Sequence, residues 1–479
     1  MTGLVRADSI ALPLADESVD LIVTSPPYFA LRSYEDGGEH FDGQIGAEPT
    51  PSAFLDALWT VTAECKRVLK PTGSMFVNLG DKYAGSGGHN NAGISSAGST
   101  LEGTCQQDRT GRSERERELR AAGAGGGGGA RRDAARDAAR RQAPNRYNQS
   151  ADVTRKSLMG LPWLYALGCT GALAALGGVD PGLDLVLRAE ILWAKPNGLP
   201  ESVRDRVRRS HEQWFHLTKS PEYFADLDQV RIPAATANPD DPSYRRAGKS
   251  RKRAKPLAAP PGMGAQSLGT GLAPRGSTNP AGTLPGSVWE VSTEPLIIPE
   301  DLGVDHFAAF PLEWPRRLIL GWSPAGICVE CGEPRRRVVI RPPGRDNNPT
   351  SSERRNGIRV NGGDYYRHAA ERAAATIDAG DECGCVTPDA PTRPAVVLDP
   401  FGGTGTTTLV ANALGRYGVS VDLSSDYLRL ARWRTEESGH DLKIIERTYG
   451  KGPARRERRR RTAAEVGVEE LELFPEALS

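Results

Sequence analysis

The most constraining feature of the sequence is a segment near its carboxyl end that predicts a strand, a glycine-rich turn, a helix and a second strand. The apolar run Ala395–Leu398 is followed by the turn Asp399-Pro400-Phe401-Gly402-Gly403-Thr404-Gly405 and a helical stretch, and the second strand ends at Asp422. Glycines between a parallel strand and its helix let a cofactor approach the backbone at the helix N-terminus. The unit therefore predicts an α/β sheet with a site for a nucleoside cofactor.

The spacing of the glycines indicates which cofactor suits this turn. A dinucleotide fingerprint needs a third Gly or Ala three positions after Gly405, where Thr408 stands, and no segment has the Gly-Lys-Ser/Thr pattern of a phosphate loop. The pattern Phe401-x-Gly403-x-Gly405 fits S-adenosylmethionine instead. Asp422 would then accept hydrogen bonds from the two ribose hydroxyls. The alternative is a glycine-rich turn that binds nothing.

A second motif follows an apolar run near the amino end. Val19–Val23 predicts a buried strand, which must end at Thr24-Ser25-Pro26-Pro27-Tyr28 because prolines cannot donate ladder hydrogen bonds. Ser25 Oγ and the Pro26 carbonyl can accept hydrogen bonds from the two N–H groups of an exocyclic amine. Tyr28 can stack on a base that has been turned out of a duplex. Taken alone, the motif could also be a proline-rich turn.

Together the two motifs resemble those of the β-class DNA amino-methyltransferases, the N4-cytosine/N6-adenine family. The catalytic motif of that family, Ser, Asp or Asn followed by Pro-Pro and an aromatic residue, is matched by Ser25–Tyr28. Its cofactor motif D-P-F-x-G-x-G-T-T is matched by Asp399–Thr407, about 370 positions later, which is the motif order of the β class. The resemblance covers roughly half of the chain. It implies a Rossmann-like, doubly wound α/β methyltransferase sheet with circularly permuted motif order, insertions and a small Cys-rich module.

The resemblance also implies roles for individual residues. Asp8 resembles the acidic residue near the adenine amino group of the cofactor, and Phe307–Pro311 resembles the segment that closes over its methionine part. Alternatives are a surface or capping role for Asp8, and core packing for Phe307, Phe310 and Trp314. The expected catalytic residues are Ser25, Pro26, Pro27 and Tyr28, and the expected cofactor-binding residues are Asp8, Phe307, Pro311, Asp399, Phe401, Gly403, Gly405, Thr406 and Asp422.

The first residue of the catalytic motif bears on the base that is modified. In the family, Ser at this position is associated with cytosine N4 and Asp with adenine N6, so Ser25 favours cytosine N4, with adenine N6 as the alternative. We expect in-line transfer of the methyl group without a covalent enzyme intermediate. C5-cytosine methylation would need an activated Pro-Cys, whereas Cys65 lies within the predicted helix Pro51–Leu69 as buried filler. Rival hypotheses are a protein or RNA amino-methyltransferase and a catalytically silent DNA-binding module.

Two pairs of cysteines predict a metal site. Cys328-x-x-Cys331 and Cys383-x-Cys385 offer four soft ligands, the number that a closed tetrahedral zinc site takes. The second pair has one intervening residue instead of two, which leaves four free thiols as the alternative. A catalytic metal is not expected, because such a site has no open position.

Composition and charge divide the chain into segments but identify no partner by themselves. Among 479 residues, 61 Lys and Arg against 60 Asp and Glu give a formal net charge of +1. The predicted segments are a catalytic half of the methyltransferase domain (1–83), a disordered Gly/Ala/Arg-rich insertion (84–155), a continuation of the methyltransferase domain (156–230), a basic loop or target-recognition region (231–287), a cofactor-closing segment (288–326), a zinc module (327–386), an S-adenosylmethionine-binding half (394–447) and a charged tail (448–479).

The expected partner is double-stranded DNA, with a cognate restriction nuclease as a further candidate and the oligomeric state left open. The amino-terminal residues lack the basic n-region of a secretory signal, and the apolar segment Leu158–Val179 is interrupted by glycines and Pro162, which favours a buried helix over a membrane span. Seven cysteines, an odd number, suggest a reducing compartment. We therefore expect a protein of the cytoplasm of a bacterial or phage-infected cell, with no membrane partner.

Overall fold

The computed structural model describes two units of the chain. The described residues are 3–30, 44–84, 153–154, 156–198, 201, 203–232, 283–296, 298–299, 302, 309–340, 377–385, 387 and 390–449, together with the backbone of 35–36 and 39–40. Unit 1 combines Met1–Ala225, Ser287–Ile327 and Thr392–Ser479, and unit 2 combines Asp226–Gly286 and Cys328–Pro391. Most of the predicted insertion 84–155, of the segment 231–287 and of the tail 448–479 lies outside the described residues.

Unit 1 is built on an eight-stranded sheet with the order β1-β14-β13-β2-β5-β7-β6-β8. The strands are β1 (Gly3–Arg6), β2 (Val19–Thr24), β5 (Leu69–Leu79), β6 (Val186–Ala194), β7 (His211–Thr218), β8 (Val288–Glu290), β13 (Val396–Asp399) and β14 (Tyr417–Asp422). The first five strands in this order, β1, β14, β13, β2 and β5, run parallel, and β7 is antiparallel to both of its neighbours. The α/β fold is thus confirmed. The antiparallel β7 makes the sheet mixed. Strands β6 and β7 are consecutive in the chain and adjacent in the sheet, so the chain reverses direction between them.

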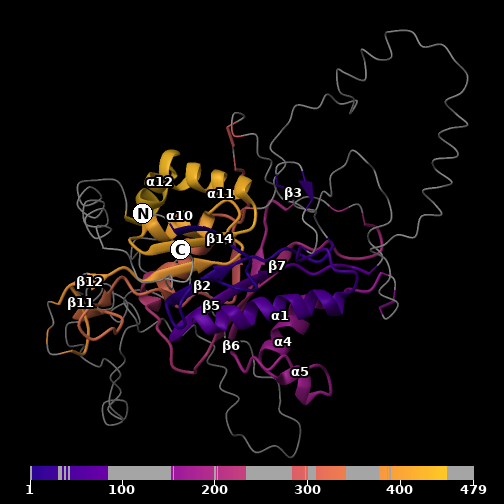
Figure 1. Ribbon diagram of the computed structural model, residues 1–479, viewed down its shortest axis with the longest axis horizontal. Coiled ribbons are helices and arrows are strands. Elements are labelled where there is room, and N and C mark those ends of the chain that lie inside the picture. Colours follow the sequence, from indigo (N-terminus) through magenta and orange to yellow (C-terminus); the bar gives the residue numbers. More distant parts are fainter. Residues whose placement is uncertain are drawn as a thin grey trace, which may run out of the picture. The chain divides into compact units, whose positions relative to one another are not determined.

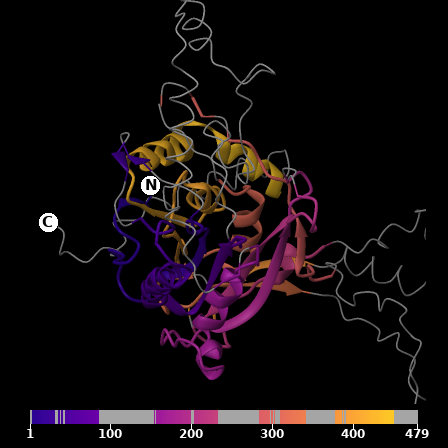
Figure 2. The same cartoon turned by 90° about the vertical axis from the view of Figure 1, so that its right-hand side faces the viewer.

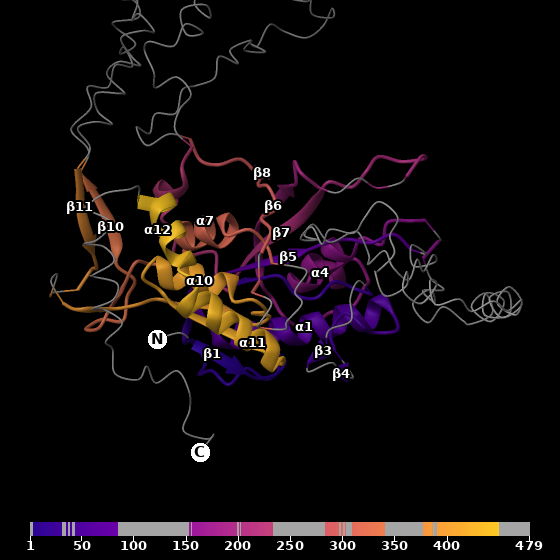
Figure 3. The same cartoon turned by 90° about the horizontal axis from the view of Figure 1, so that it is seen from above.

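Helices cover both faces of this sheet. They are α1 (Pro51–Val68), α4 (Leu161–Cys169), α5 (Ala172–Ala175), α7 (Glu313–Trp322), α10 (Thr406–Ala413), α11 (Ser425–Arg432), the π-helix η3 (Trp433–Glu437) and α12 (His440–Tyr449). Figure 1 shows α1 and α4 on one side of the strands and α10, α11 and α12 on the other. Helix α11 packs against β1 and β14 (Figure 3). The layers are those of an α/β sheet with helices on both faces.

Helix α1 shows how the sequence fixes one of these layers. Thr50 is its N-cap and accepts a hydrogen bond of 3.1 Å from the Ala53 N–H, and Pro51 occupies the first turn. The apolar face then buries Phe54 and Leu58 against the sheet. Cys65 lies on the same face and is 2% exposed, and burial raises the pKa of its thiol, so the prediction of buried filler is confirmed.

The segment Leu158–Val179 forms two short helices where the sequence predicts one mostly helical stretch. Helix α4 ends at Cys169, and Gly171, with φ of +70°, starts α5. A left-handed backbone at this position is open to glycine and interrupts the helix. Among the described residues, no helix has the length and apolar character needed to cross a membrane.

Strand β13 lies between β2, from the amino-terminal part of the sequence, and β14, which follows it near the carboxyl end. Val397 and Leu398 pair with Leu21 and Ile22 of β2, and the other edge of β13 pairs with β14. Figure 2 shows the indigo segment that contains β2 and β5 beside the magenta segment that contains β6 and β7. Because β13 and β2 are parallel, their carboxyl ends meet at one edge of the sheet, and the two motifs follow those ends.

Unit 2 is small and contains a two-stranded antiparallel sheet. Strands β10 (Arg336–Ile340) and β11 (Ile377–Glu382) pair with Arg336 opposite Glu382 and Ile340 opposite Ile377. The 3-10 helix η1 (Leu227–Val230) and a bridge between Ile232 and Thr283 belong to its other segment. The remaining short strands of the chain are β3 (Glu35–Asp36), β4 (Glu39–His40), β9 (Ile327–Cys328) and β12 (Thr392–Arg393).

Candidate functional site

The two sequence motifs meet through a buried hydrogen bond. Thr24 Oγ1, at the end of β2, donates to Asp399 Oδ1, at the end of β13, over 2.7 Å. Thr407 Oγ1 lies 2.9 Å from Asp399 Oδ2, and the Phe401 N–H donates to Asp399 Oδ1. Asp399 is 2% exposed, and burial raises the pKa of its carboxyl to about 6. The side chain of Asp399 thus joins the catalytic motif, the cofactor turn and α10.

Glycines let the backbone of the cofactor turn pack closely against its neighbours. Gly405 begins α10 with φ of +69°, and a Cβ there would lie 2.9 Å from Ala431 Cβ. A Cβ on Gly402 would lie 1.7 Å from Ser420 Oγ of β14. The turn can therefore lie this close to β14 and α11 only with glycine at these positions. It leaves a helix N-terminus at the sheet edge, which fits the sequence expectation of a nucleoside cofactor.

Asp422, the residue predicted to bind the cofactor ribose, contacts the glycine-rich turn. It is half-buried at the end of β14, and its Oδ2 accepts a hydrogen bond of 2.8 Å from the Gly403 N–H. Its Oδ1 accepts another from the Ser424 N–H. A carboxylate oxygen has two lone-pair sites, so both oxygens can accept a further hydrogen bond from a hydroxyl. The arrangement fixes the orientation of the carboxylate relative to the turn.

Asp8 follows β1 next to the same turn. It is exposed, and its Oδ1 accepts a hydrogen bond of 3.1 Å from the Ile10 N–H. Ala7 N–H donates to the Asp422 carbonyl, and Ser9 Oγ donates to the Pro400 carbonyl. Asp8 therefore lies between a residue bonded to the end of β14 and a residue bonded to the glycine-rich turn.

Thr406 is placed differently from the other residues of the cofactor motif. It is 3% exposed, and its Oγ1 accepts a hydrogen bond of 2.5 Å from Arg434 Nη1, which also donates to Thr404 Oγ1. Arg434 is 5% exposed, and burial lowers the pKa of its guanidinium to about 10. The Thr406 side chain thus supports the turn from beneath. No sequence pattern identified Arg434, which lies in the π-helix η3.

The catalytic motif is tied to the neighbouring strand by Asn78, next to the end of β5. Ser25 Oγ donates to Asn78 Oδ1 over 3.2 Å, and the Tyr28 hydroxyl lies 2.6 Å from the same oxygen. The Asn78 side-chain N–H donates to the Gln213 carbonyl of β7. Asn78 is 1% exposed, whereas Ser25 and Tyr28 are half-buried. A polar side chain at the end of a strand carries no motif of its own, so sequence reasoning missed Asn78.

Two charged residues continue this network. The Tyr28 hydroxyl lies 3.0 Å from Glu212 Oε2, and Lys195 Nζ forms an ion pair with Glu212 Oε1. Lys195 also lies over the Trp193 ring, 4.2 Å from its centroid. Neither residue belongs to the two sequence motifs, so the sequence analysis did not identify them.

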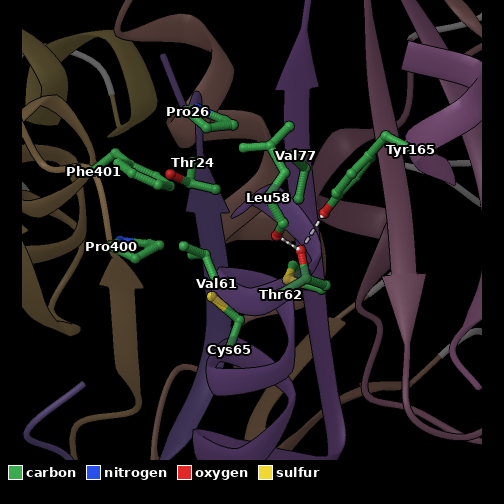
Figure 4. Close-up of a pocket in the computed structure, with 11 residues that line it drawn as sticks. Thr24, Pro26, Leu58, Val61, Thr62, Cys65, Val77, Tyr165, Pro400 and Phe401 are labelled. Carbon is green, nitrogen blue, oxygen red and sulfur yellow. Dashed lines mark hydrogen bonds between the residues drawn. The ribbon is translucent and has the colours of Figure 1, made fainter. Parts of the chain in front are cut away.

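A small cavity lies beneath the point where the motifs meet. Thr24 and Pro26 line it from the catalytic motif, and Pro400 and Phe401 from the cofactor turn. Figure 4 shows these residues facing a wall of α1 side chains, with Tyr165 of α4 at the far side. The Tyr165 hydroxyl lies 2.8 Å from Thr62 Oγ1. Residues of both motifs therefore line one cavity.

The predicted cofactor-closing segment is described only in part. Pro311 is buried directly before α7, where its carbonyl accepts a hydrogen bond of 3.1 Å from the Trp314 N–H. The Phe310 ring packs edge-on against Trp214, 5.7 Å between centroids. Helix α7 packs against β2, β5 and α10, so Pro311 lies in the layer that contains the cofactor turn. Phe307 lies outside the described residues.

Unit 2 gathers the predicted metal ligands. The Sγ atoms of Cys328, Cys331, Cys383 and Cys385 all lie within 4.8 Å of one another. The residues fit a small thiophilic metal ion, as the sequence spacing predicted.

Comparison with known proteins identifies the family. A model of the N6/N4 DNA methylase family matches residues 19–329 and 392–432. The type II methyltransferase M.SmaI of Serratia marcescens is 25% identical over 421 residues, which cover 88% of this chain and 85% of the relative. M.Cfr9I of Citrobacter freundii is 34% identical over 223 residues, 47% of this chain and 55% of the relative, so the chain spans about half the length of that protein.

Among solved structures, the PvuII DNA methyltransferase (cytosine-N4-specific) aligns with a TM-score of 0.44 and 13% identity over 94% of this chain and 92% of that one. The family match extends over well over half of the sequence and contains both motifs. The chain therefore belongs to the N6/N4 DNA methylase family, which confirms the family that the two motifs predicted.

Proposed function

We propose that this chain methylates an exocyclic amine in a specific sequence of double-stranded DNA, and that the amine is N4 of cytosine. The observation that carries the proposal is the Thr24–Asp399 hydrogen bond, which fixes the residue before Ser25 against the first residue of the cofactor turn. Direct methyl transfer requires the methyl donor and the amine that receives the methyl group to lie side by side, and adjacent strand ends provide that arrangement.

S-adenosylmethionine, when bound, supplies a methyl group on its sulfonium centre. The backbone of Gly403 and Gly405 would let the cofactor approach the start of α10, and Asp422 would accept hydrogen bonds from the ribose hydroxyls. Asp8 would lie near the adenine, and Pro311 and Phe307 near the methionine part. The close approach of the Gly402 backbone to β14 and the fixed Asp422 carboxylate support this assignment.

Ser25 and Pro26 would hold the amine. The Ser25 hydroxyl donates its proton to Asn78 Oδ1, so the lone pairs of Ser25 Oγ remain for an N–H of the amine. The carbonyl of Pro26 accepts the second N–H. Two acceptors favour a nitrogen whose lone pair is turned away from its ring, and the prolines keep them in position before the base arrives.

Tyr28 would stack on the extruded base. Its hydroxyl has one proton and two neighbouring acceptors, Asn78 Oδ1 and Glu212 Oε2, which hold the ring at the edge of the site. Asn78 is therefore a positioning residue for both Ser25 and Tyr28. The preference for cytosine rests on Ser25 itself, since Ser at this motif position is associated with N4 modification in the family.

Methyl transfer from radiolabelled S-adenosylmethionine to duplex DNA tests this proposal, with RNA and protein as comparison substrates. Digestion of the DNA and mass spectrometry of the nucleosides then separate N4-methylcytosine from N6-methyladenine. Label in N4-methylcytosine supports the proposal, label in N6-methyladenine overturns the choice of base, and label only in RNA or protein overturns the substrate class. Absence of cofactor binding by calorimetry would instead support a silent DNA-binding module.

The recognition sequence and a cognate nuclease can be sought in cells. Single-molecule sequencing of DNA from cells that express the chain reports the modified base in its context. Relatives such as M.SmaI are named type II methyltransferases, which supports a partner restriction nuclease of the same specificity. DNA from the expressing cells is expected to resist that nuclease, and cleavage equal to that of unmodified DNA would contradict the partnership.

A further inference from the structure

Four cysteine side chains converge in unit 2 outside the methyltransferase sheet. Cys328 Sγ lies 3.8 Å from Cys385 Sγ, and Cys383 Sγ lies 3.2 Å from Cys385 Sγ. All four Sγ atoms, including that of Cys331, lie within 4.8 Å of one another, and the four residues are free thiols. We propose that unit 2 binds one Zn²⁺ through these four cysteines and that this ion is structural.

The distances match the geometry of such a site. Zn–S bonds of about 2.3 Å in a tetrahedron place neighbouring sulfurs about 3.8 Å apart. The Cys328–Cys385 distance equals this value, the Cys383–Cys385 distance is 3.2 Å, and every other Sγ–Sγ distance is within 4.8 Å. Four thiolates fill every position of the tetrahedron, so no position is left for water or substrate. The ion would therefore contribute to folding and not to methyl transfer.

The backbone around the first pair, Cys328 and Cys331, forms a tight turn of the zinc-knuckle kind. The Cys328 N–H donates to the Glu333 carbonyl over 3.0 Å, and the Gly332 N–H donates to the Cys328 carbonyl over 2.9 Å. Gly332 has φ of +72°, which closes the turn directly after Cys331. This turn brings Cys331 back towards Cys328 without a contribution from the rest of the unit.

The register of the β10–β11 sheet brings the second pair to the first. Arg336 pairs with Glu382, so the chain leaves β11 directly at Cys383, beside the point where it enters β10 five residues after Cys331. Both pairs therefore lie at the same end of the sheet although 52 positions separate Cys331 from Cys383. The shorter spacing of the second pair, Cys383-x-Cys385, is compensated by this register.

The composition of the buried residues explains why a metal is needed. Among the residues of unit 2 whose burial is described, the buried apolar side chains are Cys328 and Ala390. The described part of unit 2 thus buries little apolar surface, and a small unit of this kind usually depends on a metal or disulfides for its stability. Zinc bound by four thiolates couples the binding free energy of the metal directly to folding.

The full-length chain, purified without chelator, tests the proposal by its metal content. We expect one zinc per chain by mass spectrometry of the metals, near-complete loss of zinc in Cys331→Ser, and no loss in the control Cys169→Ala, whose thiol is buried in α4. Cys331→His, which replaces one ligand by another, is expected to retain zinc even if Cys331→Ser fails to fold.

A second readout distinguishes a built site from adventitious binding. Replacement of the metal by Co²⁺ is expected to give the intense visible absorption of a tetrahedral tetrathiolate complex, and chelation is expected to release four thiols to a thiol reagent. Zinc below about one tenth per chain, equal zinc in wild type and Cys331→Ser, or a disulfide within the cluster would overturn the proposal. These outcomes do not depend on methyl transfer.

Discussion

Thr24 Oγ1 donates a 2.7 Å hydrogen bond to Asp399 Oδ1 across 375 positions of sequence. Both side chains are buried, with exposed fractions of 3% and 2%. The bond ties the residue that precedes Ser25 to the residue that begins the cofactor turn, so the two halves of the site cannot move apart without breaking it. A buried carboxylate left without this donor would be destabilised, which makes the contact specific as well as strong.

Ser25→Ala is expected to lower kcat on the order of 100-fold while cofactor affinity stays unchanged, because one preorganised acceptor for the amine is removed. Methyl transfer to duplex DNA measures kcat, and calorimetry measures cofactor binding. Ser52→Ala, at an exposed position of α1, is the matched control and should behave as wild type. Activity of Ser25→Ala within twofold of wild type would remove Ser25 from the mechanism.

Tyr28→Ala and Tyr28→Phe separate the ring from its hydroxyl. Loss of base stacking in Tyr28→Ala should weaken kcat/KM for DNA by about 5- to 150-fold. Tyr28→Phe keeps the ring and loses the hydrogen bonds to Asn78 and Glu212, so we expect a smaller effect, below about tenfold. Steady-state kinetics with duplex DNA decide between them. Equal losses in the two variants would mean that the hydroxyl, and not stacking, is what matters.

Single and double substitutions at Gly402 and Ser420 test the close approach of the turn to β14. In Gly402→Ala the new Cβ would lie 1.7 Å from Ser420 Oγ, and we expect a loss of about 3 kcal/mol in the free energy of unfolding. Ser420→Gly alone should cost about 1 kcal/mol as a glycine in a strand. The double variant should be more stable than Gly402→Ala, because the hydroxyl in conflict is gone. Additive losses in denaturant unfolding would show that the close approach to β14 does not require glycine.

Asp399 predicts a dependence of stability on pH. Burial raises the pKa of its carboxyl to about 6 from 3.8, so between these pH values the folded state keeps a proton that the unfolded state has lost. Stability from this group therefore falls as pH rises from about 4 to about 6, by up to about 3 kcal/mol. Asp399→Asn has no such titration. Urea unfolding of both proteins from pH 4.5 to 7 should show the wild type losing stability relative to the variant, and parallel curves would contradict the raised pKa.

The sequence predicts the parts of the site that have a local signature. Prolines end β2 at Ser25, and glycines mark the turn before α10, so both motifs could be placed at strand ends. The two motifs can form one site only if the strands that precede them are neighbours, and the pairing of β13 with β2 shows that they are. The boundaries of α1 also lie within one residue of the predicted helix Pro51–Leu69, since apolar periodicity is strong there.

The residues that the sequence does not reveal depend on pairing between strands. Asn78 reaches Ser25 because β5 lies beside β2, and Glu212 reaches Tyr28 because β7 lies beside β5. Neither contact follows from spacing along the chain. Arg434 is a further case, because an arginine in a charged helical segment is usually solvated, yet its guanidinium is buried beneath the cofactor turn.

The position of β13 between β2 and β14 has a consequence for biosynthesis. At about 5 to 20 residues per second, a ribosome needs roughly 20 to 75 s to extend the chain from Thr24 to Asp399. Throughout this interval the apolar edge of β2 has no partner strand on that side, and the nascent chain is exposed to wrong pairing with other polypeptides. Yield in cells should therefore respond to chaperone supply and translation speed more than to the final stability of the folded protein.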